Sequence, residues 1–508
     1  MARFLARRLA LAVGILLVLS FAIYGLLDVA LDPLSDLREN PAPNREEMIA
    51  NRVRLLNLDL PWYQRYLMWL GDFVRGDFGL AWKTMQPVGS LVQSAVATSI
   101  QLIFAATIIS ILTGVTIGLI SALRQYTSFD YVITFISFLL YSLPVFWVAV
   151  LLKQFFAIGV NDYIAAPTIN WPAVIIASVV SGLFWSGALG GRRRKKLIVF
   201  GSAFGITLLL LAALLLSGWV SNPQIGIVGI ALGSVAAALA VTSLFAGINN
   251  RRALYAALTA AVVGAIVWWP LQWLFVLVEM NWLWMVGLLA LAMVICAGIG
   301  WLYGGPDRNV SMRGAMIVGL FTSVLIFLDR VLQTWPQYYN ASEINGRPIA
   351  TLGAQTPGLN ADFWMAQLDR ATHLLLPTIA LVLISFATYT RYERGAMLEV
   401  LNQDYIRTAR AKGLSERVVI VRHALRNALM PLASVVPVDF ITLIGGAVIT
   451  ETIFSWAGMG RLFIDSMNNQ EVDPVMFYIM LTGALAMIAN LVADFLYAII
   501  DPRIRVNT

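Results

Sequence analysis

Residues 403–431, QDYIRTARAKGLSERVVIVRHALRNALMP, form a strongly basic segment between two apolar stretches. The segment contains only two carboxylates, Asp404 and Glu416, against six cations: Arg407, Arg410, Lys412, Arg417, Arg422 and Arg426. Ala409 and Gly413 stand four residues apart, so on a helix they would form one small-residue notch. Guanidinium groups form charge-assisted hydrogen bonds with carboxylates, and a notch permits close backbone approach. The segment therefore predicts a helix that docks onto another protein.

The residues of this segment leave a second interpretation open. A helix that is basic on one side and apolar on the other can lie on anionic lipid headgroups. Asp404 and Glu416 are expected to act as helix-end charges or as local partners of the arginines. His423 is expected to pack or to hydrogen-bond rather than to switch with pH.

Four ionisable residues lie inside apolar stretches: Lys153, Asp439, Glu451 and Asp494. A charge within a membrane span is costly, so each marks a candidate functional position. Asp439 follows Pro437 in VPVDFITLIGG and is predicted to lie at mid-span, and Glu451 is predicted to close the same helix.

Other kinds of chemistry find little support in the chain. Cys296 is the only cysteine, which excludes an internal disulfide and a metal site of cysteine ligands. His373 and His423 are the only histidines and lie far apart, so zinc or haem is not expected. A Gly-x-x-x-x-Gly-Lys-Ser/Thr sequence is absent, so any ATP must be used by separate chains. We therefore expect neither a metal nor a cofactor in this chain.

The elements that position these residues are membrane helices. Of the 508 residues, 59% are hydrophobic and 12% are charged, against roughly 25% charged in soluble domains. Because a span needs about 20 apolar residues, we expect an all-α polytopic membrane protein. Twelve spans are predicted at about residues 9–31, 99–122, 131–158, 171–189, 197–219, 225–248, 253–278, 282–303, 314–332, 373–392, 428–450 and 475–500. Pro144 is expected to kink the third span.

The charges of the loops predict the orientation of these spans. Arg192–Lys196, Arg251–Arg252 and the pair Arg308 and Arg313 alternate with neutral or acidic connections, as the positive-inside rule requires. This alternation places residues 403–427 and both termini in the cytoplasm, and residues 34–97 outside. Because the net charge of +7 is explained by such loops, it does not indicate nucleic-acid binding.

Five segments of the chain carry a family resemblance: Leu56–Val88, Tyr141–Trp147 (YSLPVFW), Asp404–Pro431, Gly445–Leu462 (GGAVITETIFSWAGMGRL) and Asp494–Arg505. In this order they resemble the inner-membrane permease subunits of ATP-binding-cassette importers, in the dipeptide, oligopeptide and nickel branch. The resemblance covers roughly residues 1–160 and 335–508. It implies a type I importer core of about six spans in a bacterial cell membrane.

The resemblance also implies partners and roles. These are a second homologous permease, two ATPase subunits that bind ATP and Mg, and an extracytoplasmic substrate-binding protein. The coupling segment, residues 403–427, would lie in a cleft of the ATPase, with Gly413 as its anchoring glycine. The coupling residues would be Asp404, Tyr405, Arg407, Ala409, Arg410, Lys412 and Gly413. Arg407-Thr408-Ala409 replaces the Glu-Ala-Ala of the wider importer family.

Two candidates belong to the translocation path. Asp439 could line it and meet a peptide amine, or could make a polar contact with a neighbouring helix or the partner permease. Glu451 stands where the family commonly has a glutamate, which implies a shared scaffold or gate. The alternative function is a proton-coupled secondary transporter with Asp439 or Glu451 as carriers, although no similar halves are visible. A receptor-like role without transport is a third alternative.

The departure from the family is a block of about six additional spans. We expect three segments: an N-terminal core (residues 1–160), the inserted block (161–333) and a C-terminal core (334–508). The block carries no catalytic or nucleotide motif, and it is either a peripheral annex facing lipid or a docking surface for a partner. The dipeptide, oligopeptide or nickel identity of the substrate stays open, since the binding protein makes most of that selection in such importers.

Overall fold

The structure is a computed structural model that describes residues 2–39, 43–247, 249–305, 308–445 and 447–500. Twelve helices among these residues are long and apolar enough to cross a membrane, which confirms the number of predicted spans. Helices are the expected solution, because the bilayer offers no water to backbone polar groups. Gly446, which belongs to a family-like segment, and the tail at 501–508, predicted to be cytoplasmic, lie outside the described residues.

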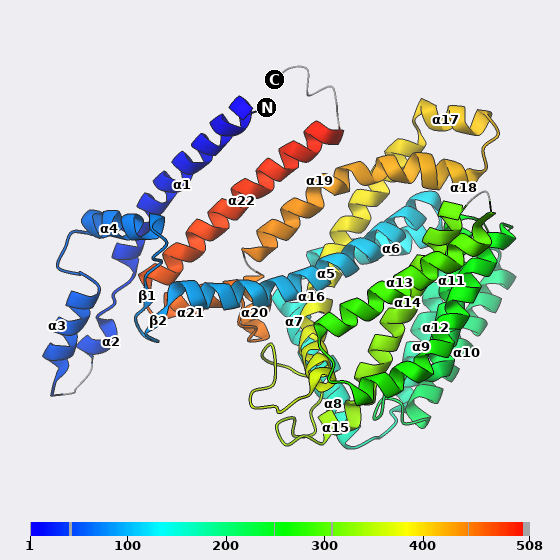
Figure 1. The fold of residues 1–508 in the computed structure, drawn as a ribbon, viewed down its shortest axis with the longest axis horizontal. Helices are drawn as coiled ribbons and strands as arrows, with labels where there is room; N and C mark the ends of the chain where they lie inside the picture. The colour runs from blue at the N-terminus through cyan, green and yellow to red at the C-terminus, as the bar shows by residue number, and fades with distance from the viewer. Residues whose placement is uncertain (1, 40–42, 248, 306–307, 446, 501–508) are drawn as a thin grey trace.

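Five long helices frame one half of the molecule: α1 (Ala2–Ala30), α5 (Val88–Leu123), α16 (Phe363–Leu401), α19 (Leu425–Ile444) and α22 (Val472–Ile500). Figure 1 shows α1 and α22 side by side at one end, with α19 following α22 toward the centre. The pair α5 and α16 has the most extensive contact of any two helices. Two short helices, α20 (Val448–Ile453) and α21 (Met459–Asn468), connect α19 to α22.

The region predicted to lie outside folds into short elements at one end of α1. It contains α2 (Ser35–Arg38), α3 (Arg45–Leu55), α4 (Trp62–Val74) and a hairpin of β1 (Leu80–Ala81) with β2 (Gln86–Pro87). The hairpin is antiparallel, with Leu80 opposite Pro87 and Ala81 opposite Gln86. Aromatic residues of α4 pack on Tyr24 of α1, so this region is joined to the membrane helices.

The third predicted span, 131–158, is not one kinked helix. It divides into α6 (Ser128–Ser142), α7 (Val145–Leu151), a π-helix η1 (Leu152–Ile158) and α8 (Gly159–Ala165). Leu143 has the extended angles φ −78° and ψ 128°, which the ring of Pro144 favours by crowding the helical conformation of the preceding residue. The predicted kink at Pro144 is therefore a complete break between two helices, α6 and α7.

The six helices of the inserted block gather at the opposite end of the molecule from α1, as Figure 1 shows. They are α9 (Trp171–Leu189), α10 (Arg193–Leu216), α11 (Gly226–Phe245), α12 (Arg251–Leu277), α13 (Trp282–Gly304) and α14 (Arg308–Gln333). None of the residues of α10 is buried, and this helix packs mainly on α9. A short helix, α15 (Trp335–Tyr339), follows α14 and returns the chain to α16.

A buried carboxylate holds the block together at one end. Both backbone amides that begin α11, of Ile225 and Gly226, donate to Asp329 Oδ1 at 2.9 and 2.8 Å. Trp268 Nε1 and Gln333 Nε2 donate to Asp329 Oδ2 at 2.8 and 2.9 Å. Four donors thus compensate for the complete burial of this side chain.

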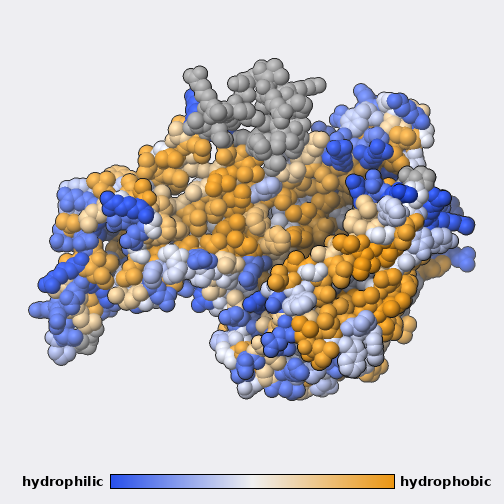
Figure 2. Space-filling model, in the orientation of Figure 1, coloured by the Kyte–Doolittle hydropathy of each residue, from blue (hydrophilic) through white to orange (hydrophobic). Residues whose placement is uncertain are grey.

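The block contacts the rest of the chain through α9, which packs against α6, and at both of its ends. At one end Trp364 of α16 packs against Phe275 of α12 and Phe327 of α14, with ring centroids 4.8 and 5.8 Å apart. At the other end, a side-chain carbon added to Gly247 would lie 2.8 Å from Arg417 Nη1. Figure 2 shows hydrophobic residues covering the sides of the long helices, as expected for surfaces that face lipid.

Candidate coupling segment and gate

The basic segment forms a short helix that projects from the membrane helices. Helix α17 (Asp404–Ala411) is followed by α18 (Glu416–Val418) and a π-helix η3 (Val419–Ala424), which continues into α19. Figure 1 shows α17 beyond the end of α16, and Figure 2 shows hydrophilic residues over it. The predicted coupling segment therefore contains three helical pieces.

The predicted notch of Ala409 and Gly413 is wrong. Helix α17 ends before Gly413, whose φ of +76° is in the left-handed region, so the two residues do not share a helix face. Such an angle favours glycine and ends a helix in the usual way. Ala409 is buried, and with Ile406 it packs in a cluster that includes Met397 of α16 and Val419 of η3.

The opposite face of α17 is polar and exposed. Tyr405, Arg407 and Arg410 are exposed on this helix, and Lys412, which directly follows it, is exposed as well. Asp404 pairs with Arg407 at 3.5 Å, as expected for a helix-end charge with a local arginine partner. The other carboxylate, Glu416, accepts from Arg410 Nη2 at 2.6 Å. The geometry thus separates an inward apolar face from an outward, mainly basic one.

Asp439 lies on α19, as predicted, and is half-buried. Tyr389 of α16 forms a side-chain hydrogen bond with it. The structure therefore contains the polar contact with a neighbouring helix that was one of the two interpretations of this residue. Tyr389 itself is 2% exposed, so the contact lies inside the helix pair.

Glu451 does not close the helix that carries Asp439. Helix α19 ends at Ile444, and Glu451 lies on the separate helix α20. Its Oε1 accepts from Ser99 Oγ of α5 at 2.6 Å, and its Oε2 accepts from the backbone amides of Gly460 and Arg461 at 2.7 and 3.2 Å. Burial raises the pKa of the Glu451 carboxyl, and these hydrogen bonds act against that rise. Glu451 thus joins α5, α20 and the first turn of α21.

Other polar contacts hold α20 from both sides. Lys153 Nζ, in η1, donates to the carbonyl oxygen of Ile453 at 3.1 Å. On the other side, Trp456 Nε1 donates to the carbonyl oxygen of Thr98 at 3.0 Å. We name the pair α20 and α21 the outer hairpin. Its helices are fixed to α5 and η1 by side chains.

Sequence reasoning missed one ion pair altogether. Arg394 of α16 donates through Nε and Nη2 to Asp130 of α6 at 2.6 and 2.9 Å. Ser121 Oγ of α5 donates to the same carboxylate at 2.6 Å. The pair connects three helices near the end of α16 that leads to α17. A carboxylate beside an apolar run was the available signal, although its partner is 264 residues away.

Comparisons with known proteins agree with this architecture. Residues 229–506 match the family described as the binding-protein-dependent transport system inner membrane component, which covers more than half of the chain. The chain therefore belongs to that family, whose members are multi-pass proteins of the inner membrane.

Three similar proteins place it more narrowly. The oligopeptide transport system permease protein OppB of Mycobacterium tuberculosis (strain ATCC 25618 / H37Rv) is 25% identical over 507 residues, which span 100% of both chains. The oligopeptide permease AppB of Bacillus subtilis (strain 168) is 46% identical over 154 residues, 30% of this chain and 48% of that protein. The dipeptide permease DppB of Escherichia coli (strain K12) is 46% identical over 138 residues, 27% of this chain and 41% of that protein. The last two matches thus cover less than half of those relatives.

Proposed function

We propose that this chain is the permease subunit of an ATP-binding-cassette importer and forms half of a translocation path for peptides. The observation that carries the proposal is α17, a basic helix that projects from the membrane helices of a chain in the binding-protein-dependent family. The names of the similar proteins support peptides as the substrate class. They give no support to the proton-coupled alternative.

The geometry of α17 favours protein docking over lipid binding. An amphipathic helix that lies on a bilayer inserts its apolar face into it. In this chain Ile406 and Ala409, which are buried on that face, pack against the chain itself. The basic face is left for a carboxylate-bearing partner, which we propose to be an ATPase subunit that binds ATP and Mg. A second permease, a second ATPase and an extracytoplasmic binding protein complete the proposed assembly.

Motion of α17 would be transmitted to the membrane helices through side chains that pack together. The cluster around Ile406 includes Met397 of α16, Ala122 of α5 and Ala428 of α19. A pull on α17 by closing ATPases therefore displaces the cytoplasmic ends of three spans together. Tyr389 and Asp439 lie on two of these spans, and we propose that their contact changes when the path converts between inward-open and outward-open forms.

The three segments predicted from the sequence are retained as a proposal. Because 154 residues are 48% of AppB, that protein has about 320 residues. It is thus shorter than the 508 residues of this chain by slightly more than the length of the block at 161–333. Because α10 has no buried residue, this part of the block is more consistent with a lipid-facing annex than with a docking surface.

The proposed topology places α17 and both termini in the cytoplasm.

The test of the function is Arg410→Glu in the complex reconstituted with its ATPases and binding protein. Arg410 is exposed, so the folded chain should keep its stability while peptide-stimulated ATP hydrolysis falls by at least about tenfold, the effect of losing one charge-assisted contact. Arg54→Glu on α3 is the matched control, since Arg54 is also exposed and lies far from α17. Unchanged peptide uptake with intact ATPase association in Arg410→Glu would overturn the proposal.

A further inference from the structure

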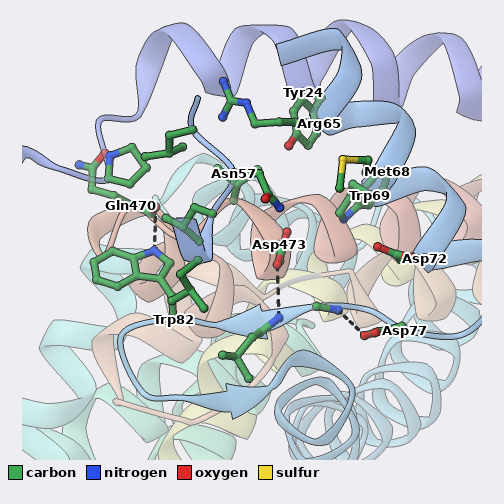
Figure 3. A pocket seen from close by; sticks show the side chains of 17 residues that line it. Tyr24, Asn57, Arg65, Met68, Trp69, Asp72, Asp77, Trp82, Gln470 and Asp473 are labelled. Atoms are coloured by element: carbon green, nitrogen blue, oxygen red, sulfur yellow. Dashed lines mark hydrogen bonds between the residues drawn. The ribbon is translucent and has the colours of Figure 1, made fainter. Parts of the chain in front are cut away.

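A small polar cavity lies between α4, the β-hairpin and the neighbouring ends of α1 and α22. We name it the outer pocket; it has a volume of about 160 Å³. Figure 3 shows Tyr24, Arg65, Asp72, Asp77 and Asp473 around it, contributed by segments far apart in the sequence. This cavity lies outside the coupling segment, the Tyr389–Asp439 contact and the outer hairpin's Glu451 site.

The pocket carries an excess of negative charge. Asp473 Oδ2 accepts from the backbone amide of Leu80 at 3.3 Å, and Asp72, Asp77 and Glu471 are close enough to repel the charge of Asp473. The one cation of the lining, Arg65, is paired with Asp28 of α1. A cationic ligand would therefore lower the electrostatic energy of the site.

A largely buried side chain at the same cavity carries a hydroxyl that lacks a protein partner. Tyr24 is 7% exposed, and its ring packs on Tyr66 and Trp69 with centroids 5.7 and 6.1 Å apart. Its hydroxyl forms no hydrogen bond with any residue in the described part of the chain, although Asp473 and Arg65 are near enough to act on it electrostatically. Because Tyr24 lines the cavity and its hydroxyl is not enclosed by protein, a group bound inside the cavity can supply the partner that the protein does not.

The size and walls of the pocket define the class of ligand. Its volume is close to that of an engineered cavity of about 150 Å³ that holds benzene. That space admits an ammonium group with a short chain of methylenes, but not a whole dipeptide. Met68, Trp69 and Leu58 supply apolar wall for such a stem. A metal is a poorer fit, since no three His, Cys, Asp or Glu side chains among the described residues are placed to hold one.

We propose that the outer pocket binds a primary ammonium group on a short aliphatic stem, as at the end of a lysine side chain. The ammonium donates hydrogen bonds to the Asp473 carboxylate and to the Tyr24 hydroxyl oxygen. The lysine belongs to a protein on the extracytoplasmic side. That this protein is the binding protein rests on the proposed function, whereas the chemistry of the pocket does not.

The experiment titrates the purified full chain in detergent with n-butylammonium at low ionic strength, followed by calorimetry. Asp473→Asn should weaken binding by at least about tenfold, because it removes the charge that receives the ammonium. Asp59→Asn is the matched control: Asp59 is an exposed aspartate of the same region that does not line the pocket, and it should leave binding unchanged. n-Butanol, which has the stem without the charge, should not bind.

A second variant tests whether weaker binding to Asp473→Asn comes from misfolding instead of the lost charge. Tyr24→Phe keeps the ring that packs on Tyr66 and Trp69, and should still weaken n-butylammonium binding by a few fold. Absence of n-butylammonium binding to the wild-type chain, or equal binding to Asp473→Asn, would overturn the proposal. If unblocked dialanine bound more tightly than n-butylammonium and acetylated dialanine did not bind, the occupant of the pocket would be the amino terminus of a peptide instead of a lysine side chain. Because the assay contains no ATPase and measures no transport, its failure leaves the proposed function standing.

Discussion

The helix pairs α5–α16 and α9–α10 are both apolar and both long enough to cross a membrane, yet they differ in what lies between them. In α5–α16, Gly114 and Gly118 bring the helices so close that an added side-chain carbon would lie 2.8 Å from Tyr389 Cβ or from the carbonyl oxygen of Thr390. In α9–α10, the contact includes a hydroxyl pair, Ser181 and Thr207, at 2.8 Å. The first pair leads into α17 and the second ends at a helix with no buried residue. A side-chain carbon added to Gly182 of α9 would also lie 2.8 Å from the Phe200 ring of α10, so the two pairs differ in burial and in what they lead to rather than in the closeness of one contact.

The largest effect should come from filling the close α5–α16 contact. Gly118→Leu forces the two helices apart, which we expect to cost about 3 kcal/mol of unfolding free energy and to abolish transport. The same change at Gly205 of α10, where an added side-chain carbon would meet no neighbouring residue within 4 Å, should be nearly neutral. Thermal unfolding of the purified chain measures both. Equal losses at the two sites would show that the helix pairs do not differ in this way.

Next in size is the removal of the charge that joins α5 to the outer hairpin. Glu451→Gln keeps the shape but leaves one of the backbone donors of α21 without an acceptor, at an expected cost of about 2 kcal/mol. Glu279→Gln, at an exposed carboxylate of the inserted block, is the control and should cost nothing measurable. Unfolding free energies compare the two, and an unaffected Glu451→Gln would remove Glu451 from the supports of the hairpin.

A smaller and local effect is expected within the block. Asp329→Asn replaces an acceptor of four hydrogen bonds by a group that is partly a donor, at a cost of about 1.5 kcal/mol. Hydrogen exchange should rise at the start of α11, and peptide uptake should remain if the block is an annex. Lost uptake with a folded core would instead assign the block a part in transport.

The smallest effect belongs to the exposed ion pair beside α17. Glu416→Gln breaks the contact with Arg410, whose side chain is 43% exposed, so we expect at most about 0.5 kcal/mol of lost stability. The released Arg410 should then bind a carboxylate-bearing partner at least as well as before. Weaker ATPase association of Glu416→Gln, measured in the purified complex, would place Glu416 in the docking surface itself.

Several features of the candidate site could be read from local pattern, while others could not. The basic composition of residues 403–431 predicted a helix with an exposed cationic face, and α17 has one. The spacing of Ala409 and Gly413 misled, because a shared face requires an unbroken helix and Gly413 ends it. Glu451 misled for a similar reason: its apolar neighbours did not reveal that α19 stops at Ile444.

Hydropathy and charge alternation by themselves determined the number of spans and indicated their orientation, because both are properties of neighbouring residues in contact with one solvent, the bilayer. The tertiary structure alone decided which helices meet. Ser99 and Glu451 are 352 residues apart, and Asp130 and Arg394 are 264 residues apart, so no local pattern announces either contact. The same holds for the outer pocket, whose ligands Tyr24 and Asp473 come together only because α1 packs along α22.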